Sequence, residues 1–193
     1  MIIDLLISEE KRMMKLINIK KDEILYYEND TCDSIGIVLE GEIKISSYSY
    51  NGNEIIYNLL TKGEMFGNNL VFSVDNKYRG NVKANKDSKI YIIHKDNLIK
   101  ILMNNELFLK EYLSIQSEFT KSLNTKIKLL SFDNAKERLL FYLSINNNKV
   151  KLKSVTHLAH ELYLSREATS RLISSLVNER IIKRNKNELI LVD

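Results

Sequence analysis

The segment LSREATSRL at residues 164–172 holds a high density of hydrogen-bonding side chains for one short predicted helix. Its opening turns carry five polar residues, which are Ser165, Arg166, Glu167, Ser170 and Arg171. Arg can bond to both O6 and N7 of guanine, and Glu can accept a hydrogen bond from N4 of cytosine. The first turns of a helix that lies in the major groove present their side chains to base edges. These residue types at this spacing therefore suit base recognition.

The residues around this segment predict a helix-turn-helix. A first helix is expected after Ser154, with Leu158 and Leu162 facing inward, and Ser165 is expected to cap a second helix. The break between them falls at Tyr163 and Leu164. A basic stretch from Lys183 to Glu188 lies between the apolar runs IIKR and ELILV and reads as a hairpin, the wing of a winged helix-turn-helix.

Two sets of contacts follow from this interpretation. We expect the base-reading residues to be Arg166, Glu167, Ser170 and Arg171. We expect phosphate contacts from Ser165, Thr169, Lys183, Arg184 and Lys186. The alternative is a solvated helix face with an internal Glu167–Arg171 pair, which would be the preferred interpretation for an isolated peptide. Here the preceding helix and the basic wing favour DNA.

The charge distribution agrees with a polyanionic partner for the last third of the chain. The whole protein carries a formal net charge of +4. From Ala135 to the end there are eleven Lys and Arg residues against six Asp and Glu residues, an excess of five positive charges, which leaves an excess of one negative charge for residues 1–134. The basic character therefore belongs to the segment that holds the predicted helix-turn-helix.

Length and composition limit the remaining possibilities. A chain of 193 residues is long enough for one large or two small domains. The lone Cys32 excludes an internal disulfide and does not supply the thiolates of a zinc or iron–sulfur site. No run of eighteen apolar residues occurs, and charged residues interrupt the N-terminus too early for a secretory signal. We expect a cytoplasmic protein.

The first half of the chain reads as a small β domain. All six glycines lie between Gly36 and Gly80, and proline is absent. The runs IGIVLEGEIKIS, NEIIYNLL and KIYIIH read as strands, and the NGN sequence at 51–53 predicts a hairpin with a type I′ turn. Regularly spaced short strands of this kind predict an antiparallel β-roll or jelly roll, and the helices that follow make the fold class α+β.

A long helix follows the β domain. Its apolar residues recur at intervals of three and four, and those expected at a dimer interface are Phe108, Tyr112, Ile115, Phe119, Leu123 and Ile127. The stripe could lie on the barrel, but its length favours a partner helix in a homodimer. SFDN at 131–134 breaks the helix, and Asp133 or Asn134 is expected to cap the next one. The predicted divisions are a sensor-like domain at 1–104, a dimerisation helix at 105–132 and a DNA-binding domain at 133–193.

These motifs together resemble the Crp/Fnr family of transcription factors. The resemblance runs through IVLEG, the NGNE hairpin, KGEMFG at 62–67, the long helix and SREATSR at 165–171. It implies a homodimer that binds a two-fold symmetric operator, with Glu167 and Arg171 reading a TGA-like half-site, and RNA polymerase as a possible further partner. Tyr163 departs from the family pattern, because the turn usually has glycine there.

The resemblance also defines an expected effector pocket. Members that bind cyclic nucleotides carry a Glu after the FG sequence for the ribose and an Arg about ten residues later for the cyclic phosphate. A gapless alignment places Asn68, after Gly67, and Tyr78 at these positions. Strand alternation would direct the adjacent Arg79 to the opposite face. We therefore expect a degenerate pocket formed by these four residues, with an effector other than cyclic AMP or none.

Other cofactors and functions have less support. His94 with Cys32 would be a poor haem site, and His157 with His160 lacks a third metal ligand, so we expect no metal and no cofactor. Metal-dependent oxygenases on small β-barrels need two or three His with a carboxylate, whereas residues 1–134 contain only His94. We therefore expect that this protein is not an enzyme. The remaining alternative is a small-molecule binding module that acts through protein partners.

Overall fold

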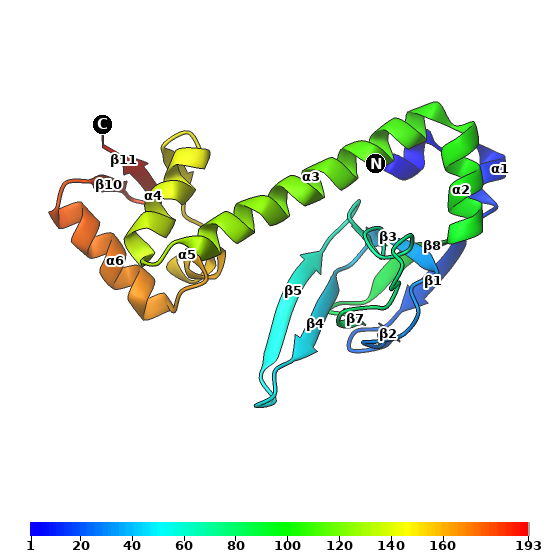
Figure 1. Cartoon of the computed structure of the whole chain (residues 1–193), viewed down its shortest axis with the longest axis horizontal. Helices are drawn as coiled ribbons and strands as arrows, with labels where there is room; N and C mark the ends of the chain where they lie inside the picture. Colours follow the sequence, from blue (N-terminus) through cyan, green and yellow to red (C-terminus); the bar gives the residue numbers. More distant parts are fainter. Residues whose placement is uncertain (193) are drawn as a thin grey trace. The chain divides into compact units, whose positions relative to one another are not determined.

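The computed structural model describes residues 1–192 and divides into two compact units (Figure 1). The first unit is Met1–Glu118, and the second begins at Phe119. Each unit has a separate cluster of buried apolar side chains. Each is therefore described by itself.

The first unit is a β-roll built from two antiparallel four-stranded sheets. One sheet has the strand order β1-β8-β3-β6, and the other has the order β2-β7-β4-β5. The strands are β1 (Lys15–Ile19), β2 (Ile24–Tyr26), β3 (Ser34–Glu40), β4 (Ile43–Tyr48), β5 (Glu54–Leu60), β6 (Met65–Phe66), β7 (Asn81–Ala84) and β8 (Ser88–His94). The predicted β-roll is thus confirmed.

Inward-facing aliphatic residues fill the roll. Ile35, Ile37 and Val38 of β3 are fully buried, as are Ile90 and Ile93 of β8. Gly36 lies between them because the Phe66 ring occupies the space that a Cβ atom would need. Packing between these two neighbouring strands of one sheet therefore depends on a glycine on β3 and an aromatic ring on β6.

Three short helices flank the strands of the roll in the sequence. They are η1 (Ile2–Leu5) and α1 (Ser8–Lys11) before β1, and α2 (Lys95–Asn104) after β8. The imidazole of His94 caps α2 by accepting a hydrogen bond from the Asp96 amide at 3.4 Å. His94 therefore has a structural role at this helix end.

Helix α3 (Glu106–Ser131) is 26 residues long, close to the predicted 105–132. Phe108 and Tyr112 near its start belong to the buried core of the roll, whereas Leu129 near its end belongs to the core of the second unit. The units divide after Glu118, inside this helix, and not at SFDN as predicted. The reason is that each end of the helix packs on a different core.

The second unit is a winged helix-turn-helix. It contains α4 (Ala135–Ile145), β9 (Lys149–Lys151), α5 (Val155–Leu162), α6 (Arg166–Asn178), β10 (Ile182–Asn185) and β11 (Glu188–Leu191). The three strands form an antiparallel sheet in the order β10-β11-β9. Asn134, Ser154 and Ser165 cap α4, α5 and α6 by accepting bonds from backbone amides, which confirms the predicted helix starts.

One predicted turn type is wrong. The hairpin between β4 and β5 is present, but only Gly52 has a positive φ, of 77°. A type I′ turn needs positive φ at both central residues, and Asn51 does not have it. Instead the Gly52 amide bonds to the Ser49 carbonyl oxygen at 2.9 Å, and Ser49 and Asn53 pair across the loop. The loop is one turn followed by a left-handed glycine.

Candidate DNA interface and effector pocket

The start of α6 presents an unobstructed polar surface. Ser165, Arg166, Glu167, Ser170 and Arg171 are all exposed. The Ser165 hydroxyl accepts the Ala168 amide at 3.1 Å, so this residue fixes the helix start. Within residues 1–192, neither arginine nor Glu167 takes part in an ion pair of 4 Å or less. The alternative of an internal Glu167–Arg171 pair therefore has no support, and these charges are available to a ligand.

The predicted contact between Thr169 and a DNA phosphate is wrong. Its side chain is fully buried, and its hydroxyl donates to the Ser165 carbonyl oxygen at 2.9 Å. A buried hydroxyl already bonded to its own helix does not reach a DNA phosphate. Position 169 faces the core because it lies next to Ile173 and Leu172 on the buried side of α6, a relation that the polar type of threonine concealed.

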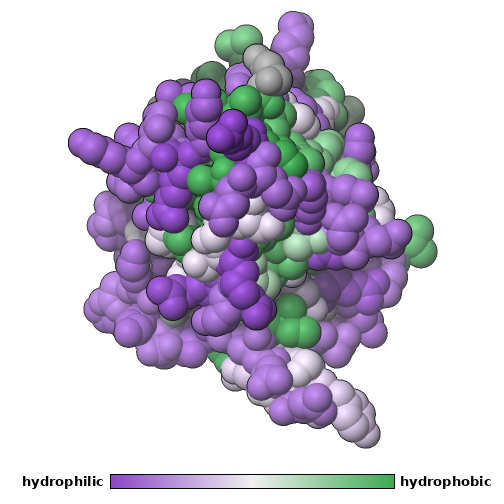
Figure 2. Space-filling model, turned by 90° about the vertical axis from the view of Figure 1, so that its left-hand side faces the viewer, coloured by the Kyte–Doolittle hydropathy of each residue, from purple (hydrophilic) through white to green (hydrophobic). Residues whose placement is uncertain are grey.

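The wing is present as predicted. Strands β10 and β11 pair from Ile182↔Leu191 to Asn185↔Glu188, which leaves Lys186 and Asn187 at the tip. The predicted phosphate-contacting side chains Lys183, Arg184 and Lys186 are all exposed. Figure 2 views the molecule from the left-hand side of Figure 1 and shows that hydrophilic side chains cover most of that face. The wing thus carries solvated positive charge.

The turn between α5 and α6 contains a strained residue. Tyr163 has φ 56° and ψ 44°, in the left-handed region, and its side chain is 44% exposed. A residue with a Cβ atom pays roughly 1–2 kcal/mol for this conformation relative to the right-handed one. Tyr163 therefore adopts the left-handed conformation that glycine would adopt without strain, and the turn between the two helices still forms.

Tyr78, one of the residues expected in the effector pocket, has a buried side chain. Tyr78 is only 2% exposed, and its ring stacks on Tyr26 with centroids 4.7 Å apart. Its hydroxyl is buried and makes no hydrogen bond within the described residues. The Cys32 thiol is a polar neighbour, but it donates to the carbonyl oxygens of Ser34 and Gly67. Burial, and next the nearby Cys32, raise the pKa of Tyr78 well above its usual range.

Arg79 points away from this pocket. Its guanidinium pairs with Asp75 at 2.7 Å and is largely exposed. Tyr78 and Arg79 lie in an irregular segment after the Thr31↔Lys77 bridge, not within a strand, so the reason for the outward direction differs from the one expected. The inward position carries a neutral phenol.

Asn68 is held by α3. Its side-chain amide donates to Gln116 Oε1 at 3.1 Å, and Gln116 Nε2 donates to the backbone carbonyl oxygen of Asn68 at 2.9 Å. The Tyr112 hydroxyl donates to the same carbonyl oxygen at 3.3 Å. The sequence did not indicate Gln116. Its only signal is its position one helical turn after Tyr112, on the same face of the predicted helix.

The predicted dimer stripe has to be divided. Phe108 and Tyr112 are buried in the roll, and Ile115 packs against the same core. These three side chains therefore pack within one subunit and are not available to a dimer interface. The apolar residues that α3 exposes are Leu107, Leu113, Leu123, Ile127 and Leu130, with exposed fractions of 65%, 54%, 41%, 64% and 51%. Phe119 is half-buried. The first half of the stripe therefore lies on the barrel, which was the alternative interpretation.

Comparison with known proteins agrees with this architecture. Residues 16–105 match the cyclic nucleotide-binding domain family. The cyclic AMP receptor protein of Thermus thermophilus is 21% identical over 165 residues, covering 82% of this chain and 75% of that protein. The anaerobic regulatory protein of Bacillus subtilis is 22% identical over 129 residues, covering 65% of this chain and 54% of that protein.

The chain therefore contains a domain of the cyclic nucleotide-binding family. The crystal structure of the Thermus thermophilus catabolite activator protein has the same fold, with a TM-score of 0.59, 18% sequence identity and coverage of 99% of this chain and 93% of that one. The family model ends at residue 105, so it includes Gly67, Asn68, Tyr78 and Arg79 but not α6. Among residues 1–192, no helix combines the length and the apolar composition that crossing a membrane requires.

Proposed function

We propose that this protein is a sequence-specific DNA-binding transcriptional regulator of the Crp/Fnr type that acts as a homodimer on a palindromic operator. The observation that carries the proposal is the exposed start of α6, where Arg166, Glu167 and Arg171 have no ion-pair partner among residues 1–192 and stand on a well-capped helix. A winged helix-turn-helix directs these turns into the major groove.

The roles are divided between two groups of residues. Arg166, Glu167, Ser170 and Arg171 read base edges, because their side chains are exposed on the first two turns of α6. Ser165 and the wing residues Lys183, Arg184 and Lys186 contact phosphates and set the position of the helix on the duplex. We assign no catalytic role to any residue, and the DNA partner implies the cytoplasm.

The homodimer follows from the exposed part of α3. Leu123, Ile127 and Leu130 recur at intervals of four and three, as in the seam of two paired helices. Pairing through this segment would bury apolar side chains that a monomer leaves in water. The dimer would present two α6 helices to two half-sites.

Selection of binding sites from a random pool of DNA duplexes tests this function. We expect enrichment of a two-fold symmetric sequence whose half-sites lie about 34–36 Å apart, one turn of the double helix. Enrichment of an asymmetric site would contradict the dimer. A pool that stays unenriched at low salt would contradict DNA recognition itself and favour the alternative, a small-molecule binding module that acts through protein partners.

A further inference from the structure

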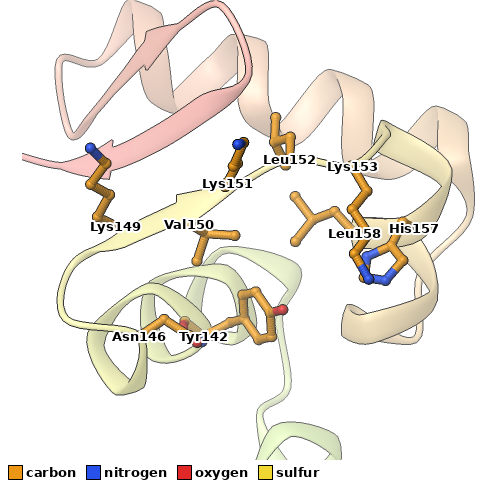
Figure 3. A pocket seen from close by; sticks show the side chains of 9 residues that line it. All are labelled: Tyr142, Asn146, Lys149, Val150, Lys151, Leu152, Lys153, His157 and Leu158. Carbon is orange, nitrogen blue, oxygen red and sulfur yellow. The ribbon is translucent and has the colours of Figure 1, made fainter. Parts of the chain in front are cut away.

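A cavity of about 260 Å³ lies beside the first helix of the helix-turn-helix, away from the residues assigned to base reading (Figure 3). It opens between the end of α4, strand β9 and the start of α5. Its lining residues are Tyr142, Asn146, Lys149, Val150, Lys151, Leu152, Lys153, His157 and Leu158. All belong to the second unit, so the cavity is a feature of a single domain.

The inner wall of the cavity is apolar. Val150 and Leu158 point toward the Tyr142 ring in Figure 3. Leu158 is 2% exposed, and Val150 and Tyr142 are half-buried. A surface of this kind accepts the hydrocarbon or ring part of a small molecule.

The rim of the cavity is cationic. Lys153 extends toward His157 at one side of the Tyr142 ring (Figure 3). Lys149 is neutralised by Glu188 at 2.9 Å, but no carboxylate within residues 1–192 lies within ion-pair distance of Lys151 or Lys153. The first turn of α5 adds no acidic side chain. Lys151 and Lys153 therefore have no ion-pair partner among residues 1–192.

A neutral donor completes the site. The Tyr142 hydroxyl makes no hydrogen bond to another described residue, and in Figure 3 it points toward the His157 side of the cavity. Burial, and next the Glu161 carboxylate, raise the pKa of this phenol. The hydroxyl keeps its proton and donates, which suits an acceptor oxygen of a ligand.

We propose that this cavity binds a small oxyanion, a carboxylate or phosphate group held by Lys153, His157 and the Tyr142 hydroxyl, with an attached apolar body resting on Val150 and Leu158. An ammonium group and a hydroxyl both bond to such oxygens, and charge-assisted bonds of this type are about twice as strong as neutral ones. The oxyanion comes either from a free small molecule or from a DNA backbone phosphate. Only the second source rests on the proposed function.

Titration of the full chain with phenyl phosphate tests the free source, because this probe combines a phosphate with a ring. We expect saturable binding with a dissociation constant of about 1 mM or below by calorimetry. The Lys153→Gln and His157→Gln variants should each bind about tenfold more weakly. Lys100→Gln removes one positive charge from an exposed site in the first unit and should bind as the wild type does. Equal weakening in Lys100→Gln would overturn the site.

Salt dependence of binding to random-sequence DNA tests the second source. If the cavity holds a backbone phosphate, Lys153→Gln lowers the slope of log affinity against log salt by about one, and Lys100→Gln leaves it unchanged. A wild-type chain that binds no DNA would refute the proposed function. The phenyl phosphate titration would then be the test of whether the cavity binds an oxyanion. No saturable phenyl phosphate binding together with an unchanged slope in Lys153→Gln would overturn the proposal.

Discussion

Asn68 and Gln116 are joined by two hydrogen bonds. The Asn68 side-chain amide donates to Gln116 Oε1 at 3.1 Å, and Gln116 Nε2 donates to the backbone carbonyl oxygen of Asn68 at 2.9 Å. The sequence comparison led us to expect Asn68 at the position where Crp/Fnr members that bind cyclic nucleotides carry the ribose-binding Glu. A side chain already bonded to α3 makes a poor ribose partner. Tyr78 fills the adjacent position, so both expected anchors of a cyclic nucleotide are occupied within the first unit.

Cyclic AMP should therefore not bind. A buried cyclic phosphate needs a cation or several N–H donors to replace its hydration, and Tyr78 offers a neutral hydroxyl. Calorimetric titration of the wild type with cyclic AMP should show no saturable heat, and Arg79→Ala should behave in the same way. Micromolar binding that disappears in Arg79→Ala would show that Arg79 turns inward and would contradict the assignment.

Removing the Tyr78 hydroxyl should stabilise the protein. A buried polar group without a hydrogen bond costs about 1–3 kcal/mol, so Tyr78→Phe should raise the free energy of unfolding by about 1 kcal/mol in denaturant titrations. Tyr26→Phe is the matched control, because the Tyr26 hydroxyl is bonded to Ser34 at 3.2 Å. That variant should lose stability or keep it unchanged.

The same residue predicts a pH dependence. The pKa of Tyr78 is raised in the folded protein, mainly by burial, from an ordinary value of 10.0. The unfolded chain therefore releases this proton first as the pH rises. Below about pH 10 the phenol is neutral in both states, so its ionisation does not affect the free energy of unfolding, and above that pH the free energy of unfolding falls progressively. Between pH 10 and 11, the free energy of unfolding should fall less steeply in Tyr78→Phe than in the wild type, and equal slopes would contradict burial of the phenol.

Arg171 should be the principal base reader. Arg171→Ala should cost about 1–3 kcal/mol at the selected operator and leave binding to random DNA nearly intact, as fluorescence anisotropy would measure. Arg180→Gly is a matched control, since it removes an exposed Arg after α6 and suits the positive φ of 59° there. Equal weakening of operator and random DNA by Arg171→Ala would show that this residue contacts phosphate instead.

The exposed end of α3 should hold the dimer. Ile127→Glu places a charge where we propose a helix–helix seam, and a buried unpaired charge is strongly destabilising, so the variant should sediment as a folded monomer with poor operator affinity. Asn124→Glu adds the same charge to an exposed polar position of the same turn and should remain a dimer. A wild-type monomer at micromolar concentration that still binds the operator tightly would argue against the seam.

Relief of strain at Tyr163 should stabilise the second unit. Glycine adopts the left-handed conformation freely, so Tyr163→Gly should raise the free energy of unfolding by up to about 1 kcal/mol. Tyr163→Ala removes the same ring but keeps a Cβ atom, so it should gain nothing. If both variants lose stability equally, the Tyr163 ring contributes more through packing than its backbone costs.

Much of the fold was readable from local residue patterns. The glycine cluster with β-branched runs predicted the roll, and capping residues Asn134, Ser154 and Ser165 marked the helix starts correctly. These features depend on neighbours within a few residues, which is the range that sequence periodicity and capping chemistry report. The polar side chains at the start of α6, which we propose read bases, are exposed as their positions in the helix led us to expect.

Other features depended on contacts between distant segments, and only the tertiary structure decided them. The stripe on α3 is continuous in sequence, yet Phe108 and Tyr112 pack on the roll while Ile127 faces solvent, because the roll meets only the first turns of the helix. The pairing of Asn68 with Gln116 joins residues 48 positions apart. Periodicity identifies which side chains share a face of an element, but it does not specify what lies opposite that face.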